Sequence, residues 1–256
     1  LLKTQEDKGD YRVNLWYPSS RSAWALFPNL NRHVEPGQKD VEWKARYLRK
    51  ADFRKALSLA IDRQRIIDAD FNSVGEPAQI APGKRSPFHY PALQNAYIDY
   101  DPERARELLD SIGLDQRDGE GYRTFPDGTR MTFYIDFTGF TGAGPINFIV
   151  ENWREVGIRA IPRMRTRAFF VTEMTARRQD FLVWAGESEH NPLMQPRSFV
   201  ASSTSGMGIQ AFGWAIWFNK GGIEGGELDE DTPWVEPPDN HPMRKSMRLL
   251  LQAQQA

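Results

Sequence analysis

The sequence predicts an α/β fold in which a sheet is flanked by helices. Between residues 131 and 186, strand, helix, strand, helix and strand patterns follow one another, which is typical of crossover connections within one sheet. The 256 residues, 40% of them hydrophobic and 26% charged, are enough to bury a sizeable core as one large domain or two small ones.

The N-terminal part contains an extended segment and a turn-rich stretch. Residues 11–18, YRVNLWYP, have the composition of a strand that stops at a proline. Residues 19–43 are rich in turn-forming residues. We expect three aromatic side chains to be buried anchors in this stretch, namely Trp24, Phe27 and Trp43.

A helical pattern follows at residues 52–63, DFRKALSLAIDR. Its apolar residues lie on one stripe of a 3.6-residue helix: Phe53, Leu57, Ala60 and Ile61. A second apolar set begins in RQRIIDADF (63–71), and Asp62 stands between the two sets. An acid at such a break can accept hydrogen bonds from the first free N–H groups of the next helix, so Asp62 is a candidate N-cap of a second helix. The alternative is one uninterrupted helix in which Asp62 is solvated.

Residues 74–100 form a long connection rich in proline and aromatic residues. Four prolines rule out a regular helix there, namely Pro77, Pro82, Pro87 and Pro91. Long connections of this kind in compact domains are often functional.

Residues 100–114, YDPERARELLDSIGL, carry a full set of helix signals. Asp101 is the expected N-cap, Pro102 occupies the first helical position, and Gly113 supplies the left-handed residue that ends the helix. Two glycine-containing turns follow in 117–137, and then a half-buried strand in which apolar residues alternate with polar ones: Met131, Phe133, Ile135 and Phe137.

The later segments alternate between helix and strand. The patterns predict a helix at 145–156, a strand at 158–165, a helix at 168–179 and a strand at 180–186. Residues 201–241 are glycine-, serine- and acid-rich loops around the aromatic segment FGWAIWFN, whose Trp214 and Trp217 we expect in the core.

Composition excludes several classes of protein. The formal net charge of −1 argues against a general nucleic-acid binder, which needs an excess of Lys and Arg on one face. No apolar run approaches the ~18 residues of a membrane span. The absence of cysteine excludes disulfides, zinc–thiolate sites and cysteine nucleophiles.

Short motifs predict no catalytic, cofactor or metal site. The segment GMGIQA (206–211) matches a dinucleotide-binding pattern, but SSTS precedes it where that motif needs a strand. No G-x-S-x-G elbow indicates a hydrolase. The histidines lack zinc-site spacing, and the acidic cluster within 227–231 lacks the pattern of a calcium loop.

Several stretches together resemble one family. They occur in the order DFRKALSLAIDR, YDPERARELLDSIGL, DGEGYRTFPDGTRMTFYIDF and NWREVGIRAIPRMR. The sequence resembles the oligopeptide/dipeptide/nickel-binding class of ABC-transporter extracytoplasmic solute-binding proteins, family 5, over residues 45–240. The segment WAIWFNKGGIEGGELDEDTPW is also similar to the tail of one peptide-binding subgroup.

The resemblance implies a mixed sheet flanked by helices in a lobe of the type II periplasmic-binding-protein-like fold. Family members have two lobes and are longer, so the chain is expected to be a C-terminal lobe fragment whose first lobe and signal peptide lie upstream. Residues 1–20 would be the hinge and the strand leading into the lobe, 21–240 the C-terminal ligand-binding lobe, and 241–256 a terminal helix that continues toward the N-terminal lobe.

The function that the resemblance implies is solute capture without catalysis. The substrate-binding component of an ABC importer closes two lobes on a peptide or similar small solute and delivers it to the permease subunits, in a periplasmic or other extracytoplasmic location. No cofactor and no nucleic acid are implied. The alternative is the solute-sensing lobe of a cytosolic transcription regulator, in which a DNA-binding domain would precede the lobe.

The expected solute site follows the last predicted strand. Peptide-binding members carry a W-x-A-D segment there, whose Asp pairs with the α-ammonium of the ligand; this sequence keeps the tryptophan but lacks the Asp, and its nearest acids are Glu187 and Glu189. Either acid is a candidate partner for a cationic group of the solute. The alternative is that both are solvated loop residues. The candidate substrate-binding residues are Trp16, Trp184, Glu187, Glu189, His190 and Asn191.

Overall fold

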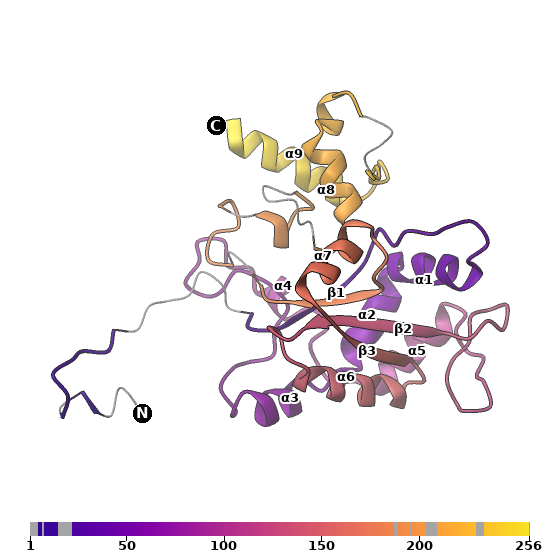
Figure 1. Ribbon diagram of the computed structural model, residues 1–256, viewed down its shortest axis with the longest axis horizontal. Helices are drawn as coiled ribbons and strands as arrows, with labels where there is room; N and C mark the ends of the chain where they lie inside the picture. Colours follow the sequence, from indigo (N-terminus) through magenta and orange to yellow (C-terminus); the bar gives the residue numbers. More distant parts are fainter. Residues whose placement is uncertain are drawn as a thin grey trace.

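The computed structural model describes residues 5, 6, 8–14, 22–186, 189–194, 196–202, 209–228 and 233–255. Within these residues the chain folds into a four-stranded mixed sheet flanked by helices (Figure 1). The predicted α/β fold class is therefore confirmed.

The sheet combines parallel and antiparallel pairs in the order β1–β4–β2–β3. Its strands are β1 (Ala25–Pro28), β2 (Thr132–Thr138), β3 (Arg159–Arg165) and β4 (Phe181–Trp184). Strand β2 runs parallel to both β3 and β4, whereas β1 is antiparallel to β4. Because Ala25 pairs with Trp184, the start of β1 lies beside the end of β4.

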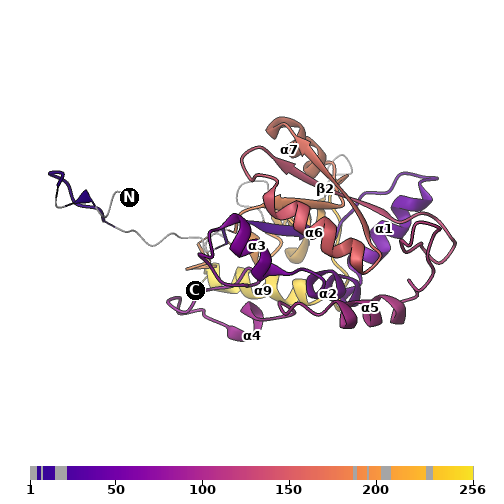
Figure 2. The same cartoon turned by 90° about the horizontal axis from the view of Figure 1, so that it is seen from below.

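Helices pack on both faces of this sheet, and Figure 1 draws α6 and α7 on opposite sides of it. The α-helices are α1 (Lys39–Arg49), α2 (Ala51–Leu59), α3 (Arg63–Asp70), α4 (Pro91–Gln94), α5 (Pro102–Ser111), α6 (Gly144–Glu155), α7 (Arg167–Thr175), α8 (Phe212–Asn219) and α9 (Pro242–Gln255). Short 3-10 turns occupy Pro196–Ser198 and Gly222–Glu224. Figure 2, seen from below, shows α6 lying along the sheet with α2 and α5 beneath it.

The alternation of side chains along β4 separates two hydrophobic clusters. Phe181 and Val183 belong to the main core with residues of α2, α5, α6 and β2. Leu182 faces the other way and packs with Phe27 of β1 and Phe170 of α7. The period of two along the strand thus places helices on both faces. The α8–α9 region forms a third cluster that contains both of the tryptophans expected in the core, Trp214 and Trp217.

Two aspartates cap helices as the sequence indicates. The side chain of Asp62 accepts a hydrogen bond from the Arg65 N–H at 3.0 Å, and α2 ends before α3 begins. The alternative of one uninterrupted helix is therefore wrong, because the helix is interrupted between Leu59 and Arg63. Asp101 caps α5 by accepting from the Arg104 N–H at 2.8 Å, and Gly113 follows that helix with a φ of +85°.

We expect Asp101→Ala to lower the free energy of unfolding by about 1 kcal/mol, because the first N–H groups of α5 lose their acceptor. The midpoint of urea unfolding measures this loss. Asp115→Ala is the matched control, since Asp115 is exposed and lies beyond the end of α5. Equal midpoints for the wild type and Asp101→Ala would mean that the cap does not stabilise the fold.

The N-terminal predictions need correction. Residues 11–14 of the strand expected at 11–18 are not in a strand, and the rest of that segment lies outside the described residues. The turn-rich stretch 19–43 contains β1 and the first residues of α1. Phe27 is buried as expected, whereas the other two anchors, Trp24 and Trp43, are only partly buried against the main core.

Candidate functional site

The carboxyl ends of β2, β3 and β4 meet at one edge of the sheet. The chain leaves this edge after Thr138, Arg165 and Trp184 respectively. Since β1 runs in the opposite direction, Ser22 and the residues leading into β1 lie at the same edge. Ligands of open α/β sheets bind outside the carboxyl ends of strands, so this edge, hereafter the strand-end edge, is the first candidate site.

Aromatic side chains gather at the strand-end edge around Trp184. The ring of Trp184 stacks on Phe170 of α7 with centroids 5.9 Å apart and planes at 25°. Phe140, in the connection after β2, lies 6.3 Å from Trp184 and is 79% exposed. The guanidinium of Arg167 lies 5.4 Å from the Trp184 ring centroid. The edge therefore offers an aromatic surface with one exposed cation beside it.

Two partly exposed arginines surround a buried acid near the end of β2. Asp136 is fully buried and accepts two hydrogen bonds from Arg163 at 2.9 Å each. The Nε–H of Arg165 donates a third hydrogen bond to Asp136 at 3.1 Å. The alternation of β2 predicts a solvent-facing acid at 136, but helices cover both faces of the sheet: one face of β2 packs in the main core, and α7 contacts β2 as well.

Glu189 is not exposed to solvent. Its side chain is buried, and both of its carboxylate oxygens accept hydrogen bonds from Ser22: Oε2 from the backbone N–H at 2.7 Å and Oε1 from the hydroxyl at 2.6 Å. The alternative that Glu189 is a solvated loop residue is wrong for this reason. Direct contact of Glu189 with a solute stays a prediction.

The other candidate residues have different surroundings. Trp184 stands at the strand-end edge, as described above. His190 is exposed, and its carbonyl accepts a hydrogen bond from the hydroxyl of Ser86 at 2.6 Å. The Asn191 side chain accepts from the Leu193 N–H at 3.1 Å. Trp16 and Glu187 lie outside the described residues.

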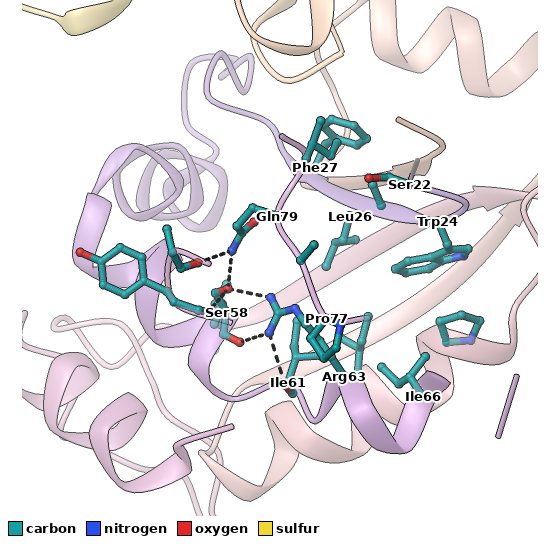
Figure 3. Close-up of a pocket in the computed structure, with 18 of the residues that line it drawn as sticks. Ser22, Trp24, Leu26, Phe27, Ser58, Ile61, Arg63, Ile66, Pro77 and Gln79 are labelled. Atoms are coloured by element: carbon teal, nitrogen blue, oxygen red, sulfur yellow. Dashed lines mark hydrogen bonds between the residues drawn. The ribbon is translucent and has the colours of Figure 1, made fainter. Parts of the chain in front are cut away.

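A cavity of about 1050 Å³ is the second candidate site (Figure 3). It runs along the outer edge of β1, where Trp24 and Leu26 line it, and is bounded by α2, α3 and the connection 74–97. The long connection forms part of this wall; it also contains the one-turn helix α4, so the expectation that its prolines rule out a helix is wrong. Among the described residues, the Trp24 indole N–H is buried without a hydrogen-bond partner.

The polar centre of the cavity wall is occupied by contacts within the chain. Arg63 donates to the carbonyl of Ser58 at 2.9 Å and to its hydroxyl oxygen at 2.7 Å, and Gln79 donates to the same hydroxyl oxygen at 3.1 Å (Figure 3). Burial lowers the pKa of Arg63 to about 10, so its side chain stays cationic at neutral pH. The cavity is therefore apolar around a group of polar side chains that bind one another.

Two classes of site are not found in the described part of the chain. No cluster of three or more His, Cys, Asp or Glu residues there has the arrangement of a metal site. None of the helices within it is long and apolar enough to cross a membrane.

Comparison with known sequences assigns the family. The sequence model of the family described as "Bacterial extracellular solute-binding proteins, family 5 Middle" matches residues 2–206. The chain belongs to this family. The resemblance read from the helix and strand motifs is thereby confirmed.

Solved structures agree with the family and extend the likeness to the whole chain. The oligopeptide-binding protein OppA superposes with a TM-score of 0.80 and 30% sequence identity, covering 98% of this chain and 39% of OppA. The periplasmic binding protein MelB of Agrobacterium fabrum C58, solved in complex with stachyose, has a TM-score of 0.64 at 19% identity and covers 90% of this chain and 33% of MelB. The MelB likeness shows a shared fold.

One curated relative adds a partial sequence match. The periplasmic alpha-galactoside-binding protein of Rhizobium meliloti (strain 1021) is 37% identical over 82 residues, which are 31% of this chain and 12% of that protein. The family 5 chain described here thus spans well under two thirds of the length of these relatives.

Proposed function

We propose that this family 5 chain is the C-terminal lobe of the substrate-binding component of an ABC importer. The observation that carries the proposal is the family match over residues 2–206, supported by the likeness to OppA over 98% of the chain. In the proposed mechanism a second lobe closes on the strand-end edge, the solute is trapped between the lobes, and the closed protein delivers it to membrane permease subunits. The proposed location is periplasmic or otherwise extracytoplasmic.

The proposal assigns a role to each part of the chain. Residues 1–20 act as the hinge and 21–240 as the lobe, while 241–256, which include α9, lead toward the second lobe. We propose that polypeptide outside this chain covers the cavity beside β1, because core residues such as Phe181 and Trp153 line it. The chain performs no catalytic step in this scheme, which agrees with relatives that are named as binding proteins.

The family match favours an importer over a cytosolic regulator, because the family is one of extracellular proteins. For the solute, peptides and neutral oligosaccharides are the two classes that we propose to test. The peptide class is supported by the likeness to OppA. The oligosaccharide class is supported by the aromatic surface of Phe140 and Trp184, because rigid rings provide large apolar contact area for the faces of a sugar.

A thermal-shift screen tests the proposed function. A protein that carries both lobes is titrated with tetraalanine and stachyose, one probe for each class. We expect one probe to stabilise the protein by about 2.7 kcal/mol when its concentration is 100 times Kd. No stabilisation by either class, or chemical conversion of a probe by the purified protein, would contradict the proposal.

For a solute that carries an ammonium group, we propose Glu187 as its partner. Glu189 is already bound to Ser22, and Glu187 is the other acid in the segment after β4. In the two-lobed protein Glu187→Gln is expected to weaken tetraalanine binding at least ~10-fold, about 1.4 kcal/mol, and to leave stachyose binding unchanged. Glu151→Gln, at an exposed pair on α6, is the control. Equal tetraalanine affinities in calorimetry for wild type and Glu187→Gln would refute this assignment.

A further inference from the structure

The loop that follows β4 is hydrogen-bonded to two other segments that are far from it in the sequence. Ser22 belongs to the segment entering β1, Gly186 and Glu189 belong to the loop, and Ser86 belongs to the long connection 74–100. All of them are held by short hydrogen bonds. The loop at the strand-end edge is thus attached to two other parts of the lobe.

The first attachment is the pair formed by Glu189 and Ser22. A buried carboxylate needs hydrogen-bond donors to replace its water, and Ser22 supplies both its backbone N–H and its hydroxyl, at 2.7 and 2.6 Å. In return, the Gly186 N–H donates to the Ser22 carbonyl at 2.9 Å. Three hydrogen bonds therefore join one residue before β1 to two residues after β4.

The arrangement requires glycine at position 186. A Cβ added there would lie 2.7 Å from Oε2 of Glu189 and 2.8 Å from Cβ of Ser22, which is closer than side-chain atoms approach one another. The backbone of the loop thus passes directly against the pair. The carbonyl of His190, one residue beyond Glu189, is fixed from the other side by the Ser86 hydroxyl at 2.6 Å.

We propose that Glu189 is a positioning residue that locks the loop after β4 to the segment entering β1, so that the strand-end edge is held in its solute-binding geometry. This inference rests on the proposed function. Its geometric basis is the set of hydrogen bonds by which Ser22 holds Glu189 and Gly186.

A direct role and a positioning role of Glu189 predict different effects of amide substitution. If Glu189 pairs with a charge on the solute, loss of its own charge weakens binding. If Glu189 positions the loop, Glu189→Gln retains the lock, because its carbonyl oxygen accepts from the Ser22 N–H and its amide donates to the Ser22 hydroxyl oxygen. Glu189→Met has a similar length but accepts neither hydrogen bond.

Calorimetry on the two-lobed protein, with tetraalanine and stachyose as probes, tests the inference. For the probe that binds, we expect Glu189→Met to weaken binding at least ~10-fold, about 1.4 kcal/mol, while Glu189→Gln stays within about threefold of the wild type. Ser22→Ala is expected to weaken binding about threefold or more, and the double variant Ser22→Ala/Glu189→Met no more than Glu189→Met alone, because the two residues form one contact. Glu151→Met is the control for the chemical change.

The results that would contradict the positioning role of Glu189 differ from those that would contradict the proposed function. Three results would each overturn the inference. Glu189→Met could bind the probe as tightly as the wild type, Glu189→Gln could lose as much affinity as Glu189→Met, or the losses of affinity in the double variant could be additive. If Glu189→Met does not fold, Ser22→Ala and Gly186→Ala test the inference instead. Wild-type affinity for the probe in both variants would overturn the inference. Binding of neither probe by the wild type would instead refute the proposed function, and the inference with it.

Discussion

Replacing Asp180 by alanine is expected to lower the free energy of unfolding by about 3–5 kcal/mol, because buried Lys44 and partly buried Arg32 lose this carboxylate. Lys44 keeps the longer pair with Asp40 at 3.8 Å. The Asp180 side chain is only 1% exposed, and its carboxylate binds Arg32 at 2.9 Å and Lys44 at 3.4 Å. It also accepts from the backbone N–H of Tyr134 at 3.0 Å, which ties it to β2. The Lys44 side chain is 5% exposed, so water reaches it poorly when the acid is removed.

Urea unfolding of Asp180→Ala measures this loss, with Glu35→Ala as the matched control. Glu35 also pairs with an arginine, Arg178, but both side chains are about half exposed. An exposed pair contributes about 0–1 kcal/mol, so the control is expected to unfold almost as the wild type does. A loss below about 1 kcal/mol for Asp180→Ala would mean that water solvates Arg32 and Lys44 after the substitution.

Replacing Trp153 by alanine is expected to cost about 3–5 kcal/mol of stability, because a large buried side chain is removed from the main core. Trp153 on α6 is 1% exposed, and its ring lies 5.1 Å from that of Phe181 on β4. The indole N–H donates to the Leu57 carbonyl at 3.0 Å, which links α6 to α2. The substitution removes the packing and leaves the Leu57 carbonyl without this donor.

Trp153→Phe separates packing from the hydrogen bond. Phenylalanine keeps most of the ring volume but has no donor for Leu57, so we expect a loss of about 1–3 kcal/mol, the cost of one unsatisfied buried group. Thermal unfolding followed by circular dichroism compares the two variants. Equal losses in Trp153→Phe and Trp153→Ala would show that the hydrogen bond, not the packing, fixes α6 on α2.

The parts of the fold that were predicted depend on local interactions. Asp62 and Asp101 cap helices through hydrogen bonds to residues three positions later, so the sequence alone indicates them. The alternating apolar residues of β2 and the position of Gly157 after α6 are likewise local signals. These segments differ from their predicted bounds by only a few residues.

The parts that were missed depend on partners far along the chain. Strand β1 has four residues and ends in a proline, and it is a strand because it pairs with β4, more than 150 positions later. Buried Asp136 and Glu189 look like surface acids until Arg163 and Ser22 are brought to them by the fold. No local pattern predicts such partners, so the sequence alone does not indicate that Glu189 is buried, and the solute site at the end of β4 stays a prediction.

The central claim is that this chain is one half of a solute-binding cleft, and calorimetry on two forms of the protein tests it most directly. The bound probe, tetraalanine or stachyose, is titrated into the two-lobed protein and into the 256-residue chain alone. Because one lobe buries only part of a small ligand, we expect the chain alone to bind more weakly than ~1 mM, about −4 kcal/mol, and the two-lobed protein to bind about a thousandfold or more tightly. Micromolar binding by the chain alone, or equal affinity of the two forms, would contradict the account.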